Sequence, residues 1–117
     1  MTSNPTLTVV KDVASLIQVN QAATVSRTVM RAETCRAVVF SFDTGEKLSE
    51  HTAAMPAVLQ VLDGRLLIQA DGQDIEFVPG DLIHFGTRLP HAVEALEPSK
   101  LLLLMLDPRE AGAQAAD

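Results

Sequence analysis

Short runs of β-prone residues, separated by turn signals about every eight to twelve residues, organise most of this chain. This spacing is typical of an all-β sandwich or barrel, and no long stretch has helical periodicity. Strands are expected at Thr24–Arg31, Cys35–Phe42, Val58–Leu62, Arg65–Ala70, Gln73–Val78, Asp81–Phe85, His91–Ala95 and Leu101–Leu106. Residues 11–20 are compatible with either a short helical turn or an edge strand.

Two Asp-Gly pairs, Asp63-Gly64 and Asp71-Gly72, lie between β-prone runs. Asp-Gly favours a two-residue turn with positive φ at both central residues, because that turn matches the twist of paired strands. The segment from residue 58 to residue 78 is therefore predicted to be a three-stranded antiparallel meander.

The composition fits a single globular domain and excludes some partners. The chain has 117 residues, of which 47% are hydrophobic and 21% charged. It has neither Trp nor Tyr, so the core must consist mainly of aliphatic side chains and Met. The net charge is −6 and the nine Lys and Arg residues are scattered along the chain. This distribution argues against nucleic acid and against anionic membrane surfaces as partners.

The sequence also predicts a cytoplasmic location. Cys35 is the single cysteine and cannot form an intrachain disulfide, which fits a reducing compartment. Residues 1–13 contain no basic region followed by an apolar run, as a secretory signal would. The apolar run Leu101–Leu106 is too short to cross a bilayer, which takes about 20 helical residues, and is predicted to be a buried strand.

Two stretches of the sequence share the spacing of known motifs. In "GEKLSEHTAAMPAVLQVLDG", Gly45 is followed after five residues by His51, and the stretch ends at Gly64. Further along the chain come Gly80 and His91. These positions are in register with the two motifs of small single-domain cupins, which the chain resembles.

The second motif departs from the cupin pattern at three positions. Gly86 and Arg88 stand where the family has a proline and a second glycine, and Ala95 stands where it has an asparagine. The resemblance covers roughly residues 25–106 and implies an all-β fold, the cupin-type double-stranded β-helix or jelly-roll barrel. The expected parts are an N-terminal arm of strand or turn at 1–24, the barrel domain at 25–106 and a C-terminal tail at 107–117.

The resemblance also implies a degenerate metal site. Cupins that bind metal usually use two His and a Glu from the first motif and one His from the second. Only His51 and His91 match these ligand positions, while Ala53 and Ala57 stand where the second His and the Glu would be. Two histidines and water would hold a divalent transition metal weakly. If His84 faces inward, a three-histidine site becomes possible.

An apolar pocket with two polar anchors is the alternative to a metal centre. His51 and Ala53 share a face of an extended strand, because side chains two residues apart point the same way. The residues expected to line the pocket are His51, Ala53, Met55, Ala57, Leu59 and His91.

Two functions fit this pattern. The first is a binding module that holds a small molecule in the barrel pocket, with His51 and His91 as polar anchors. The second is a metal-dependent enzyme, of oxygenase or isomerase type, that uses His51 and His91, with His84 as a third ligand if it faces inward. The run Leu101–Leu106 lacks polar alternation, which indicates a strand covered on both faces and predicts a homodimer formed by sheet packing.

Overall fold

The computed structural model describes residues 5–107, which form one short 3-10 helix and nine strands. The elements are η1 (Val13–Leu16), β1 (Thr24–Ala32), β2 (Cys35–Phe42), β3 (Lys47–His51), β4 (Ala57–Asp63), β5 (Leu66–Ala70), β6 (Gln73–Phe77), β7 (Leu82–Phe85), β8 (His91–Ala95) and β9 (Ser99–Leu106). The predicted tail lies outside the described residues, apart from Asp107.

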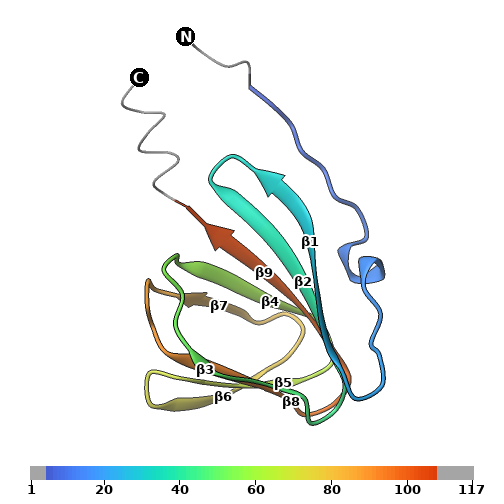
Figure 1. Ribbon diagram of the computed structural model, residues 1–117, viewed down its shortest axis with the longest axis vertical. Coiled ribbons are helices and arrows are strands. Elements are labelled where there is room, and N and C mark those ends of the chain that lie inside the picture. The colour runs from blue at the N-terminus through green and yellow to red at the C-terminus, as the bar shows by residue number, and fades with distance from the viewer. Residues whose placement is uncertain (1–4, 108–117) are drawn as a thin grey trace.

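The strands form two antiparallel sheets that face each other. A five-stranded sheet has the order β1-β2-β9-β4-β7, and a four-stranded sheet has the order β3-β8-β5-β6. The two sheets meet at one end of the molecule and spread apart at the other (Figure 1). The prediction of an all-β jelly-roll barrel is therefore confirmed.

We name the two ends of the barrel by the strand ends found there. The closed end is where β8 ends at Ala95 and β9 begins at Ser99. The open end is where β3 ends at His51 and β8 begins at His91. The largest fully buried hydrophobic side chains between the sheets are Phe42, Phe77, Leu66, Ile68 and Leu101.

The predicted three-stranded meander is wrong at its first turn. Asp71 and Gly72 have φ values of 53° and 69°, as the expected turn requires, and they join the paired strands β5 and β6. The other Asp-Gly pair joins β4 to β5, which lie in different sheets. Gly64 has φ of 89°, and a Cβ there would collide with Pro98 O and with Ser99. Because glycine has no Cβ, the chain can pass close to the start of β9 where it crosses from one sheet to the other.

Strand β3 was not among the predicted strands. Its side chains are mostly exposed and polar, and only Leu48 is half-buried, so hydrophobic alternation gives no signal. The strand lies at the edge of the four-stranded sheet, where pairing with β8 holds it.

The segment before β1 lies against the outer face of the five-stranded sheet. Residues 13–16 form the 3-10 helix, so the helical alternative for residues 11–20 is correct and the edge strand is not. Arg27 Nη1 donates a hydrogen bond to Leu16 O, and Lys100 Nζ donates one to Ala14 O. Ile17 is 5% exposed. Within residues 5–107, no helix has the length and apolar character to cross a membrane.

Candidate functional site

His51 and His91 lie side by side at the open end of the barrel. They are partners across β3 and β8, and their ring centroids are 4.3 Å apart at an interplanar angle of 64°. The register of β3 shifts between Leu48 and His51. As a result, Leu48 lies opposite Val93 and His51 lies opposite His91, and both of these β8 residues face inward. This irregularity brings the His51 ring to the barrel interior, although the ring stays exposed to solvent.

Backbone carbonyls hold the same nitrogen of each ring. His51 Nδ1 is 2.7 Å from Ser49 O, and His91 Nδ1 is 2.9 Å from Leu89 O. A carbonyl oxygen only accepts, so Nδ1 carries the hydrogen in both rings, and Nε2 of a neutral ring keeps its lone pair. Neither Nε2 atom has a hydrogen-bond partner in the described part of the chain.

The environment of His91 favours its neutral form. Burial lowers the pKa of the His91 imidazole below its ordinary value. The hydrogen bond to Leu89 O raises this pKa, and the nearby His51 ring lowers it, so the net direction is downward. The Nε2 atom of His91 is therefore a hydrogen-bond acceptor, or a metal ligand, near neutral pH.

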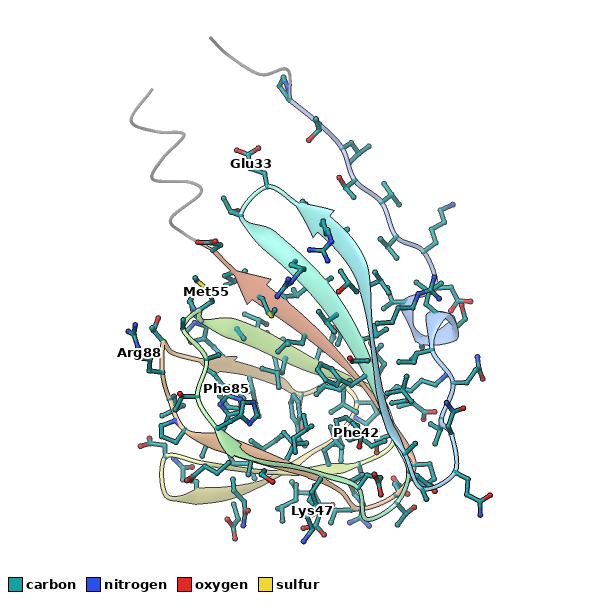
Figure 2. All side chains as sticks on the ribbon, viewed as in Figure 1. Glu33, Phe42, Lys47, Met55, Phe85 and Arg88 are labelled. Carbon is teal, nitrogen blue, oxygen red and sulfur yellow. The ribbon has the colours of Figure 1, made fainter. Side chains whose placement is uncertain are left out.

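Phe85 lies against the histidine pair, although it was not among the residues predicted to line the pocket. Its ring stacks on His91 with centroids 4.2 Å apart and an interplanar angle of 20°, and its side chain is only 4% exposed. Figure 2 places Phe85 between the two sheets. Ala57 is its partner on β4, and both residues are buried in the hydrophobic core. Phe85 and Ile83 are two residues apart, so they share one face of β7, and both are apolar. This alternation could have identified Phe85 as an inward-facing residue, as Ile83, which packs against the core, also is.

The other residues expected to line the pocket are divided between the core and the rim. Ala57 and Leu59 are 7% and 2% exposed and belong to the hydrophobic core. Ala53 is exposed in the loop after β3, where its carbonyl accepts a hydrogen bond from Arg88 N at 2.9 Å. Met55 is half-buried and lines a groove beside β9.

His84 does not join the histidine pair. It is exposed on β7 opposite Val58, whereas Ile83 and Phe85 on the same strand face the core. The alternation of side chains along a strand therefore directs His84 to the outer face of the sheet. Among residues 5–107, no three side chains of His, Cys, Asp or Glu are grouped so that they could hold a metal ion. The hypothetical three-histidine site is thus wrong.

Comparisons with known proteins identify the family. The model of the cupin domain matches residues 38–107, more than half of the chain, and the protein therefore belongs to the cupin domain family. No curated protein sequence matches the chain.

Several solved structures are similar to this one. A cupin superfamily protein from Desulfitobacterium hafniense is 28% identical with a TM-score of 0.75, and the match covers 80% of this chain and 85% of the other. A conserved protein of unknown function from Streptococcus pyogenes is 26% identical with a TM-score of 0.76 over 91% and 93% of the two chains. The DMSP lyase DddQ from Ruegeria pomeroyi is 17% identical with a TM-score of 0.67 over 72% and 47%, which shows a common fold alone.

Proposed function

We propose that the protein binds a small molecule at the open end of its barrel, with His51 and His91 as the polar anchors. The observation that carries this proposal is the fixed tautomer of the two adjacent rings. Each Nδ1–H is bonded to a backbone carbonyl, and each Nε2 lone pair has no partner within residues 5–107. A ligand that donates hydrogen bonds would satisfy both lone pairs.

The surroundings of the pair favour a ligand with an apolar portion. Phe85 stacks on one side of His91, and Ala57 lies next to Phe85 on the neighbouring strand. Apolar walls with a few polar groups are typical of small-molecule sites. A small hydroxyl- or amine-bearing molecule fits this combination of acceptors and apolar contacts.

A metal-dependent enzyme is the second candidate. Histidines that bind metals usually donate the other ring N–H to a carbonyl or carboxylate, as both rings do here. The donor set of this site is two imidazoles without a carboxylate. Zinc sites of proteins use three or four protein ligands, so two imidazoles fit only a weakly held divalent metal.

Ring nitrogen NMR would test the proposal directly, because the chain has only three histidines. Small alcohols, amines and hydroxy acids that raise the thermal midpoint would be titrated into protein labelled with 15N at histidine. We expect the Nε2 resonances of His51 and His91 to move and those of His84 to stay. The His84→Asn variant, altered on the outer face, is the matched control.

Two results would count against this function. If the compounds that stabilise the protein shift neither His51 nor His91, the anchors are wrong. If elemental analysis of protein purified without an affinity tag finds one equivalent of a transition metal, the metal-dependent enzyme becomes the better assignment.

The homodimer remains a prediction, and the outer face of the five-stranded sheet is the surface we propose for it. Leu102, Leu104 and Val58 are half-buried on this face, and Leu82 on β7 is 69% exposed. A second copy would cover these side chains. Light scattering coupled to size exclusion should give twice the chain mass of 12.6 kDa, and a monomer mass across micromolar concentrations would contradict the prediction. The cytoplasmic location likewise stays a prediction.

A further inference from the structure

One row of side chains crosses the inner face of the five-stranded sheet. Arg31, Arg36, Met105, Ala57 and Phe85 are successive partners on β1, β2, β9, β4 and β7. Residues directly opposite each other on paired strands share a face of the sheet. Because Phe85 and Ala57 face the core, the two arginines project from that same inner face. They lie next to the turn that joins β1 to β2, because β1 ends at Ala32 and β2 begins at Cys35. Figure 1 shows this turn extending beyond the second sheet.

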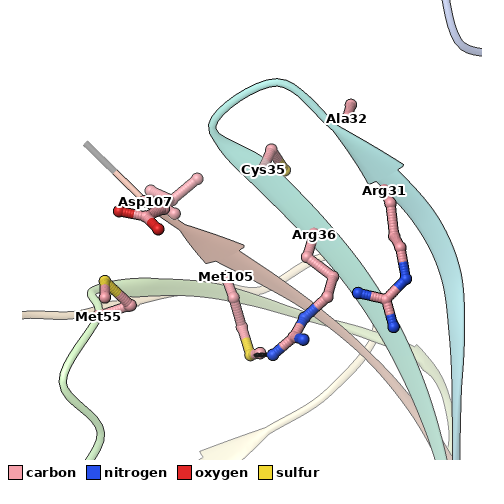
Figure 3. A pocket seen from close by; sticks show the side chains of 8 residues that line it. Arg31, Ala32, Cys35, Arg36, Met55, Met105 and Asp107 are labelled. Atoms are coloured by element: carbon pink, nitrogen blue, oxygen red, sulfur yellow. Dashed lines mark hydrogen bonds between the residues drawn. The ribbon is translucent and has the colours of Figure 1, made fainter. Parts of the chain in front are cut away.

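A groove of about 440 Å³ opens beside these two arginines. Figure 3 shows Arg31 and Arg36 on one side of it, with Met105 between them and Met55. The residues lining the groove are Arg31, Ala32, Cys35, Arg36, Met55, Met105, Leu106 and Asp107. The walls therefore combine two guanidinium groups, one carboxylate, that of Asp107, and the thioether side chains of two methionines.

Neither guanidinium has an ion-pair partner in the described part of the chain. Arg36 Nη2 is 3.3 Å from Met105 Sδ, which is a weak acceptor, and Arg31 has no side-chain hydrogen bond there. Four other basic side chains, those of Arg27, Lys47, Arg65 and Lys100, do have partners within the fold. Arg65, for example, pairs with Glu76 at 2.8 Å, and Lys100 Nζ donates to Ala14 O at 2.7 Å.

Two like charges directly opposite each other on paired strands destabilise a sheet. An oxyanion between them would remove the repulsion and accept from both groups, since the guanidinium fork matches carboxylate and phosphate geometry. The chain as a whole is acidic, with a net charge of −6, so two adjacent arginines are a local excess of positive charge.

We propose that this groove binds the oxyanion end of a small organic anion, with Arg31 and Arg36 as its partners. The apolar body of the anion lies along Met55 and Met105, and its far end reaches toward Phe85 and the histidine pair. Arg36 and Phe85 are three strand spacings apart along the row, or about 14 Å between backbones, and the arginine side chain spans part of that distance. The inference rests on the proposed function and specifies its ligand as an organic anion that also carries a hydrogen-bond donor.

The test compares three probes with the same apolar chain: hexanoate, hexyl phosphate and hexanol. Binding is measured by titration calorimetry and by amide NMR shifts of the wild-type protein. We expect at least one of the two anions to bind about tenfold or more tightly than hexanol, because charge-assisted bonds are stronger than neutral ones. The tighter of the two anions identifies the oxyanion as carboxylate or phosphate.

Three variants assign the site. Arg31→Gln with Arg36→Gln should reduce anion affinity to that of hexanol, while Arg88→Gln, in the exposed loop before His91, should leave it unchanged. Arg31→Lys with Arg36→Lys keeps the charge and removes the fork, so its affinity should fall between the two. This conservative pair keeps the test decisive if the glutamine pair does not fold.

Two outcomes would overturn the inference: neither anion binds better than hexanol, or anion binding survives loss of both arginines. Failure of the proposed function has a different signature. This arm uses 6-hydroxyhexanoate, which adds a hydroxyl donor for the Nε2 atoms at the far end of the chain. If its binding depends on the arginines but His51→Asn with His91→Asn has no effect on its affinity, the anion site is supported and the histidine anchors are wrong.

Discussion

Two polar sites at opposite ends of the barrel, Ser99 and the histidine pair, differ in whether the fold supplies their hydrogen-bond partners. At the closed end, Ser99 is fully buried, and its Oγ accepts from Arg65 N at 2.9 Å and lies within bonding distance of Arg65 O and Glu97 O. At the open end, the Nε2 atoms of His51 and His91 have no partner within residues 5–107. In the described part of the chain, the Arg36 guanidinium donates a hydrogen bond only to the sulfur of Met105.

This difference separates the part of the fold that provides stability from the part that is available for binding. A buried polar group with internal partners stabilises the fold, and one that keeps free donors or lone pairs is available to a ligand. We therefore expect substitutions at the closed end to affect unfolding. Substitutions at the open end should affect ligand or metal binding more than stability.

The largest effect should come from Gly64→Ala at the closed end. A Cβ at this position would meet Pro98 O and Ser99, and φ is 89°. Overpacking and backbone strain together should reduce the free energy of unfolding by about 3 kcal/mol or more. Gly45→Ala is the matched control, since its φ is 84° and, apart from the neighbouring residues in the chain, no atom of residues 5–107 lies within 4 Å of the added Cβ. It should cost about 1–2 kcal/mol in urea unfolding. Equal losses for the two variants would contradict the role of close packing at Gly64.

The next effect concerns metal at the open end. Ala53→His with Ala57→Glu would add the two ligand types that the cupin resemblance implies are missing beside His51 and His91. A metal that binds only the folded variant should raise its stability by about 2.7 kcal/mol at a hundred times its dissociation constant. Thermal midpoints with and without manganese, iron(II) or zinc would measure this.

In the unaltered protein, the same metals should raise the thermal midpoint only slightly. An equal rise in both proteins would mean that the histidine pair already recruits another ligand. Phe85 beside Ala57 makes the glutamate position crowded, so the metal-free variant should be less stable than the parent.

A pair of buried serines gives a smaller but cleaner comparison. Ser99→Ala removes the Oγ that bonds Arg65 and Glu97, and should cost about 1–3 kcal/mol. Ser41 is equally buried, but its Oγ has no hydrogen-bond partner among residues 5–107. Ser41→Ala should therefore leave the urea midpoint unchanged or raise it. A loss for Ser41→Ala as large as that for Ser99→Ala would show that the Ser41 hydroxyl is satisfied in solution.

The smallest effect is a pH dependence that comes from His91. Its pKa in the fold lies below the ordinary value of 6.5, so the unfolded chain takes up the proton first as the pH falls. The stability contributed by neutral His91 is present above pH 6.5 and decreases as the pH falls from there through the folded pKa.

Urea midpoints at pH 8 and pH 5.5, measured with a chelator, would check this effect. The decrease should become smaller in His91→Asn and persist in His84→Asn. An identical decrease in the parent and in His91→Asn would assign the pH dependence to other groups.

Much of the fold follows from local sequence signals. The runs Cys35–Phe42 and His91–Ala95 were predicted with the bounds that the structure has, because alternating or continuous apolar residues identify strands locally. The pairing of strands is not local. The Asp-Gly pair at 63–64 was interpreted as a hairpin turn, but the chain there crosses between sheets, and contact with Ser99 decides its path.

The sequence by itself determined the barrel, the positions of His51 and His91 and the absence of ligand types at Ala53 and Ala57. These are properties of residue identity and spacing. Tertiary structure decided which side chains meet. The register of β3 with β8 brought the two imidazoles together, alternation along β7 turned His84 outward, and the pairing of β1, β2 and β9 placed Arg31 and Arg36 on the inner face. Strand register and sheet order depend on contacts between residues far apart in the chain, which no local pattern encodes.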